Sequence, residues 1–161
     1  ETNDFYYAPY TYGFSNYSRK DYRKNILKYG NVIDLDGKGP HGTHLGGTGI
    51  AISNSSKYKD IALEYSYWIA GADCQQTIFY ESGGQPGNSV AWQNKEINDH
   101  NNNFFNATRQ TLDQAWVRPR HNGYMKFQDE SGNIINEYLQ SNIKEDTIMN
   151  KLSSMYLESF N

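Results

Sequence analysis

The 161-residue chain lacks several features that would place it in a particular class. It has a single cysteine, Cys74, so neither an internal disulfide nor a site built from several thiolates can form. Its apolar runs are only a few residues long, too short to cross a membrane. Its net charge of -3 argues against a protein that binds nucleic acid by neutralising phosphates. What remains is a water-soluble globular chain of about one domain in length.

Aromatic and amide side chains are abundant. The chain has 14 Tyr and 18 Asn. Aromatic rings with polar rims suit wet, partly apolar contact surfaces, including sugar-binding clefts. The bias of an AT-rich genome explains the same composition more simply. Composition alone therefore names no function.

Hydrophobic patterning predicts few strands and many helices. Strands are expected at 32–35, between glycine turns, and at 50–53, where β-branched residues alternate after a glycine-dense stretch at 39–49. Apolar spacing predicts helices at about 57–70, 73–80, 89–92, 103–115, 124–140 and 143–158. Ser56, Asp73 and Ser89 are expected to cap the first three, and Asn142 with Glu145 resembles a capping box at the start of the last. The sequence thus predicts a helix-rich α/β fold with too few strands for a complete sheet.

No motif specifies catalysis, a metal or a cofactor. His41 and His44 could ligate a metal, but two histidines in a glycine-rich loop are more often ordinary loop residues. The glycine run precedes a predicted strand, whereas a phosphate-binding loop follows one. The neighbouring carboxylates Asp129 and Glu130 point in different directions on a helix. We therefore predict no catalytic residue, no metal and no cofactor.

Several segments, in order, carry a more specific signal. Residues 45–57 read Leu-Gly-Gly-Thr-Gly-Ile-Ala-Ile-Ser-Asn-Ser-Ser-Lys, and an Ala-x-Glu-Tyr-x-x-Trp pattern follows at 62–68. Residues 80–86 form a Tyr-Glu-Ser-Gly-Gly-Gln-Pro turn. The segments 104–120 and 123–128, and the upstream stretch 9–19, complete the set. Together these segments resemble the bacterial extracellular solute-binding proteins, the sugar-binding components of ABC importers.

The resemblance implies a fold and a domain organisation. The chain would be the C-terminal part of a two-lobed periplasmic-binding-protein (type II) fold, cut or processed from a longer protein. Residues 1–44 would be an irregular pre-hinge segment with a short strand. Residues 45–86 would supply the hinge strand and helices of the first lobe, and residues 87–161 the helical C-terminal part of the second lobe.

The resemblance also implies a function. A protein of this family captures a carbohydrate outside the cytoplasm, anchored to the membrane as a lipoprotein, and delivers it to ABC transporter permease subunits without catalysis. Thr48 stands where many members carry an aromatic residue, which leaves the ligand open. Because the lobes close around the ligand together, we expect this chain alone to bind sugar weakly or not at all. The alternatives are a carbohydrate-active enzyme domain with an aromatic-lined cleft, and an interaction module that uses the Tyr-rich N-terminal stretch.

Candidate ligand-binding residues follow from these segments. Glycines let the backbone approach a ligand closely, arginines bind hydroxyls, and aromatic rings stack on sugar faces. The predicted ligand-binding residues are Gly46, Gly47, Arg118, Arg120, Tyr124 and Phe127. Each has a competing role: the glycines in a hinge bend, the arginines in surface ion pairs, and the rings in core packing. Trp116 is expected to be a core anchor.

Overall fold

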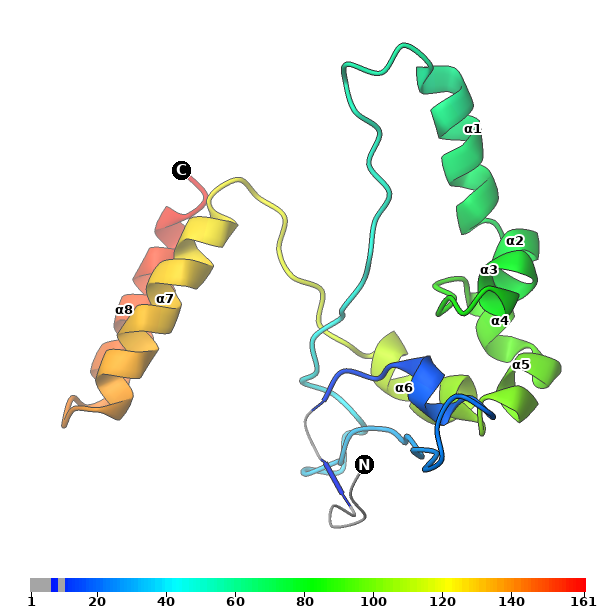
Figure 1. Cartoon of the computed structure of the whole chain (residues 1–161). Coiled ribbons are helices and arrows are strands. Elements are labelled where there is room, and N and C mark those ends of the chain that lie inside the picture. Colours follow the sequence, from blue (N-terminus) through cyan, green and yellow to red (C-terminus); the bar gives the residue numbers. More distant parts are fainter. Residues whose placement is uncertain (1–6, 9–10) are drawn as a thin grey trace. The chain divides into compact units, whose positions relative to one another are not determined.

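The computed structural model describes residues 7, 8 and 11–161 (Figure 1). Pro9 and Tyr10, the first two residues of the 9–19 stretch, lie outside the described residues. Half of the described residues are helical. The elements are the 3-10 helix η1 (Ser15–Ser18) and the α-helices α1 (Lys59–Ala70), α2 (Ala72–Gln76), α3 (Ile78–Glu81), α4 (Ser89–Gln93), α5 (Lys95–His100), α6 (Phe104–Asp113), α7 (Tyr124–Leu139) and α8 (Glu145–Glu158).

The predicted α/β class is wrong for the described residues, because they contain no strand. The segments 32–35 and 50–53 are both irregular. The described chain has one isolated parallel bridge, between His44 and Trp116. A strand needs a paired neighbour to satisfy its backbone groups, and alternating side chains alone do not provide one. The protein is therefore helix-rich, as predicted, but nearly strand-free.

Most predicted helices are present within a few residues, but their caps differ. The side chain of Asn88 caps α4, in place of the predicted Ser89. Neither α1 nor α2 has a side-chain cap, so the caps predicted at Ser56 and Asp73 do not form. Helix α8 begins at Glu145 after Lys144, without the predicted Asn142–Glu145 capping box.

Helix α5 was not expected. Its residues lie between the helices predicted at 89–92 and 103–115. The signal was the side chain of Asn94, whose Oδ1 accepts the backbone N–H groups of Glu96 and Ile97 at 2.9 and 3.2 Å. Such a cap satisfies donors that the first turn leaves unpaired.

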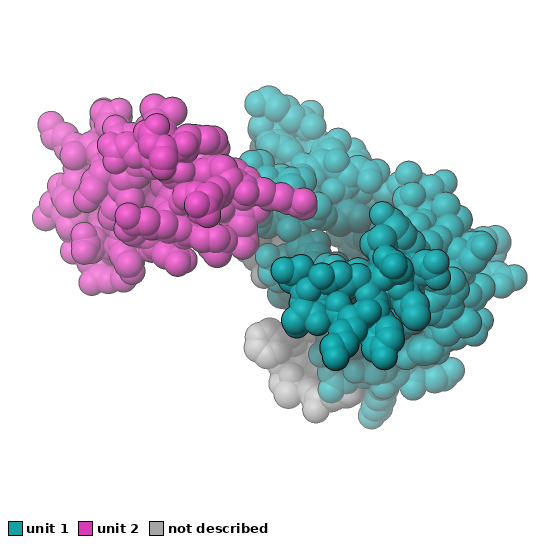
Figure 2. Space-filling model, turned by 90° about the horizontal axis from the view of Figure 1, so that it is seen from above, with its two compact units in different colours: residues 1–117 teal, residues 118–161 magenta. Residues whose placement is uncertain are grey.

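The chain divides into unit 1, residues 1–117, and unit 2, residues 118–161 (Figure 2). The predicted boundaries at 44/45 and 86/87 both fall inside unit 1. The assignment of segments to lobes stays a prediction. No helix in the described part of the chain has the length and apolar character needed to span a membrane.

Unit 1 has an aromatic core built by α3–α6. It consists of Tyr80, Ala91, Trp92, Ile97, Phe104 and Phe105, with Tyr29 and Leu112 packed against it. The rings of Phe104 and Phe105 meet edge to face at 5.1 Å. The buried amide of Asn98 joins three helices, donating to the Trp92 carbonyl oxygen at 2.9 Å and accepting the N–H of Asn106 at 3.0 Å. This core supports the loops on its surface.

The 80–86 turn binds the N-terminal segment to this core. The side chain of Gln85 accepts the backbone N–H of Ser15 at 2.7 Å and donates to the carbonyl oxygen of Gly13 at 3.2 Å. Arg19 lies over the Tyr80 ring at 4.4 Å and donates to the Tyr80 carbonyl oxygen at 3.0 Å. Burial raises the pKa of the Tyr80 phenol, and the charge and hydrogen bond of Arg19 partly oppose that rise. The turn predicted from the Gly-Gly-Gln-Pro motif is thus a structural clamp.

Unit 2 is a helical hairpin of α7 and α8. Five rings pack together where α7 begins and α8 ends: His121, Tyr124, Phe127, Tyr156 and Phe160. His121 stacks on Phe160 with centroids 4.0 Å apart. A methyl group on Gly123 would overlap the backbone of Ser159, so only glycine allows this close approach.

Candidate functional site

The predicted glycine-rich segment passes beside the end of α6 in unit 1. The backbone N–H of Trp116 donates to the Thr43 carbonyl oxygen at 2.7 Å, and the N–H of Leu45 donates to the Trp116 carbonyl oxygen at 2.9 Å. These two bonds make the isolated bridge and fix residues 43–45 against 116. They also bring the rings of His44 and Trp116 together, with centroids 5.0 Å apart.

Thr111 on α6 holds the approach to this bridge. Its hydroxyl accepts the backbone N–H of Val32 at 2.9 Å and donates to Oδ1 of Asn31 at 3.0 Å. Its own backbone N–H donates to the same Asn31 oxygen at 3.0 Å. One threonine therefore anchors residues 31–32 to the helix that leads to Trp116.

An open depression of about 570 Å³ lies at the bridge, lined by Gly42, Thr43, His44 and Trp116. The depression is open to solvent rather than enclosed. Trp116 is 48% exposed. The expectation that Trp116 is a core anchor is therefore wrong, because its backbone is held while its ring faces solvent.

The two predicted ligand-binding glycines lie just beyond this depression. A Cβ on Gly46 would lie 3.0 Å from Cε1 of Tyr12, so the space left by the glycine is filled by that ring. Gly47 has open space where its side chain would be. Both glycines are exposed, and Gly46 in addition packs against the ring of Tyr12. Their role in ligand binding stays a prediction.

The other four predicted ligand-binding residues belong to unit 2. Arg118 and Arg120 are exposed, in the irregular segment before α7. Tyr124 is 6% exposed and Phe127 is half-buried, and their centroids lie 6.0 Å apart in the aromatic cluster of the hairpin. The competing core role predicted for these rings is therefore present in the structure. Within unit 2, the arginines are the accessible members of the predicted set.

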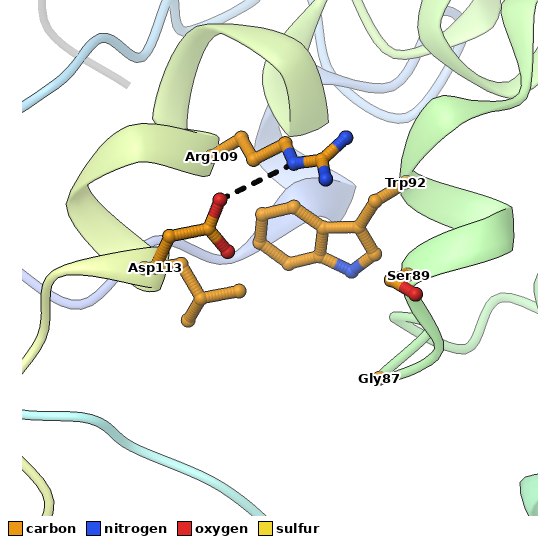
Figure 3. A pocket seen from close by; sticks show the side chains of 6 residues that line it. Gly87, Ser89, Trp92, Arg109 and Asp113 are labelled. Carbon is orange, nitrogen blue, oxygen red and sulfur yellow. Dashed lines mark hydrogen bonds and ion pairs between the residues drawn. The ribbon is translucent and has the colours of Figure 1, made fainter.

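A second, much smaller cavity lies beside Trp92 (Figure 3). Its volume is about 50 Å³, and Gly87, Ser89, Leu112 and the Arg109–Asp113 ion pair complete its lining. The ion pair spans 3.3 Å between Nε and Oδ2 on neighbouring turns of α6. This volume is far below that of typical ligand sites, so the cavity is a packing gap next to the core.

The 34–41 turn shows how the two candidate metal-binding histidines are used. Oδ1 of Asp34 accepts the N–H of Gly37 at 2.8 Å, and Oδ2 accepts that of Gly39 at 2.9 Å. These bonds, the Gly39 one foremost, lower the pKa of the Asp34 carboxyl. Nε2 of His41 lies 3.6 Å from Oδ2 of Asp36, while the ring of His44 lies beside that of Trp116, with centroids 5.0 Å apart and planes tilted by 31°. No cluster of three or more potential metal-binding side chains exists in the described ranges.

Sequence reasoning missed Tyr12 and Thr111, and gave Trp116 and His44 other roles. Tyr12 was one of many tyrosines in an irregular stretch, and Thr111 was one polar residue on a helix. Their importance comes from contacts across 34 and 79 residues of sequence, which no local spacing encodes. No protein-family model, no curated protein and no solved structure matches this chain.

Proposed function

We propose that this chain is the C-terminal part of an extracellular solute-binding protein that captures a carbohydrate for an ABC importer, without catalysis. The segments from 9–19 to 123–128 support this proposal, because each resembles a segment of that family and they follow one another in the same order. The observation that carries it is the open depression beside the glycine-rich segment. An exposed indole beside accessible backbone is the kind of surface that binds sugar rings.

Two further features support a two-lobed receptor. The segment from 50 to 53, with its alternating β-branched residues, forms no strand within the described chain. Helix α1 follows it, and none of its residues is buried. A strand-like sequence followed by an apolar helix is typical of an α/β lobe whose sheet is completed by other segments. In this proposal the lobes would be of the type II periplasmic-binding class, located extracellularly or in the periplasm as a lipoprotein.

Because the depression is lined by residues of unit 1, the expectation of weak or absent binding narrows to weak binding by the chain alone. A receptor of this type closes two lobes around its ligand, so a chain with pieces of each offers only part of the contacts. We expect dissociation constants of about 1 mM or weaker for neutral oligosaccharides. The ABC transporter permease subunits would bind the complete two-lobed receptor.

The test is a titration of the ¹⁵N-labelled chain with a panel of maltotriose, cellotriose, xylotriose and raffinose, monitored by amide chemical shifts. The expected result is a saturable shift with at least one sugar, at millimolar concentration, with every sugar recovered intact by chromatography. Cleaved sugar would instead indicate the enzyme alternative. Micromolar binding by calorimetry would contradict the two-lobe interpretation, and the absence of saturable shifts with all four sugars would contradict carbohydrate capture.

A further inference from the structure

Three aromatic rings from distant parts of unit 1 gather around residues 44–46. The rings of His44 and Trp116 lie 5.0 Å apart with an interplanar angle of 31°. The ring of Tyr12 lies against Gly46, two residues further along. Tyr12 is 57% and Trp116 48% exposed, and His44 is also exposed. Large rings that face solvent together mark contact surfaces more often than a single exposed ring does.

Backbone hydrogen bonds hold the two residues of the ring pair in place. The bonds from Trp116 N–H to Thr43 and from Leu45 N–H to Trp116 fix both residues. Thr111 anchors the chain that leads into them. A surface held in place before it meets a ligand loses less conformational freedom on binding, which favours affinity.

The lining of the depression selects the chemistry of the ligand. Its four residues include no carboxylate, lysine or arginine. They provide an indole, an imidazole, the hydroxyl of Thr43 and the accessible backbone of Gly42. Such a surface matches a neutral molecule with one apolar face and a hydroxylated edge, rather than a phosphate or a carboxylate.

We propose that Trp116 and His44 form a stacking platform for the apolar face of a neutral sugar ring, with Tyr12 beside it. This inference rests on the proposed function and names side chains of unit 1 that hold the sugar. None of these three was among the residues that the sequence predicted to bind. The platform belongs wholly to unit 1 and so accounts for the weak binding expected of this chain.

The experiment follows the indole N–H signals of the ¹⁵N-labelled full chain during the same sugar titration. The chain has three tryptophans, Trp68, Trp92 and Trp116, so three signals suffice and single Trp→Phe variants assign them. The Trp116 signal is expected to shift saturably. Trp116→Ala is expected to weaken binding roughly tenfold, the loss of one stacking contact.

Trp68→Ala is the matched control, because Trp68 on α1 is equally exposed at 48%. The Trp68→Ala variant is expected to bind sugar with the same affinity as the unmodified chain. Trp116→Phe keeps a ring and is expected to retain most of the affinity. Because the bridge uses only the backbone of Trp116, both Trp116 variants should keep the amide spectrum of the folded chain.

The outcomes separate this inference from the proposed function. Saturable amide shifts elsewhere, with the Trp116 signal unmoved, would overturn the platform and leave carbohydrate capture standing. Equal losses in Trp116→Phe and Trp116→Ala would overturn stacking, as would an equal loss in Trp68→Ala. No saturable shift with any sugar would overturn the platform together with the function on which it rests.

Discussion

Helices α1 and α6 have similar sequence patterns and opposite surroundings. Both carry large apolar residues at helical spacing, and both helices form where that spacing predicts them. In α6, Phe104 and Phe105 are 2% and 0% exposed. In α1, Ile61 is 67% and Trp68 48% exposed. Periodicity therefore predicts the helix, whereas burial depends on whether another element supplies a complementary surface.

Helix α7 is intermediate between α1 and α6 in how much of its surface is buried. It finds one partner, α8, and buries Tyr124 and Ser131 against it. Many of its other apolar residues, including Met125 and Leu139, stay exposed at 53% and 73%. A helix thus gains stability from each surface that covers it, and the three helices differ in how many such surfaces they meet.

The largest expected effect comes from truncating a ring in the core. Phe105→Ala should destabilise unit 1 by about 3–5 kcal/mol, because it leaves a cavity among fully buried rings. Ile61→Ala on α1 should change stability by less than about 0.5 kcal/mol. All three tryptophans precede residue 118, so tryptophan fluorescence during urea unfolding reports on unit 1. Similar losses of stability in Phe105→Ala and Ile61→Ala would show that another surface covers α1 in solution.

Two glycines test the contact made by α7. Gly123→Ala should destabilise the hairpin by about 1–3 kcal/mol, because a methyl group there overlaps the backbone of Ser159. Gly132, in the middle of α7, has no heavy atom near its absent side chain. Gly132→Ala should therefore stabilise the helix by about 0.5–1 kcal/mol. Amide hydrogen exchange of α7 measures both changes in stability. A Gly123→Ala variant as stable as the unmodified chain would contradict the close approach of the two helices.

The smallest effect separates a long-range hydrogen bond from a local one. Thr111→Val on α6 should destabilise unit 1 by about 1 kcal/mol, because it leaves the Val32 N–H without its acceptor. Ser66→Ala on α1 removes only a bond to the Ala62 carbonyl oxygen one turn earlier, and should be nearly neutral. Urea unfolding compares the two. Equal losses would mean that Thr111 does not anchor the 31–32 segment.

The fold could be predicted in its helices but not in its strands. Apolar spacing acts within a turn or two, so α1, α6, α7 and α8 begin and end close to where the sequence indicates, although none of the four has a side-chain cap. A strand depends on a partner from elsewhere in the chain. The segments 32–35 and 50–53 have strand-like sequences and yet remain irregular. Helix α5 is absent from the predicted helices, although Asn94 caps it.

The candidate site divides in the same way. The sequence indicated the region around Gly46 and Gly47, because a glycine-dense segment marks accessible backbone. It could not indicate that Tyr12 and Trp116 lie beside that region. Nor could it assign Tyr124 to a core, since the spacing of Tyr124 and Phe127 fits a ligand platform and a helix interface equally well.

By itself, the sequence determined where this chain coils into helices and which segment exposes its backbone, because these properties depend on interactions between residues a few positions apart. Only the tertiary structure decided that Tyr124 is buried, that Trp116 faces solvent, and that His44 lies beside it. Those outcomes depend on contacts between residues tens of positions apart, whose formation depends on the packing of the whole unit.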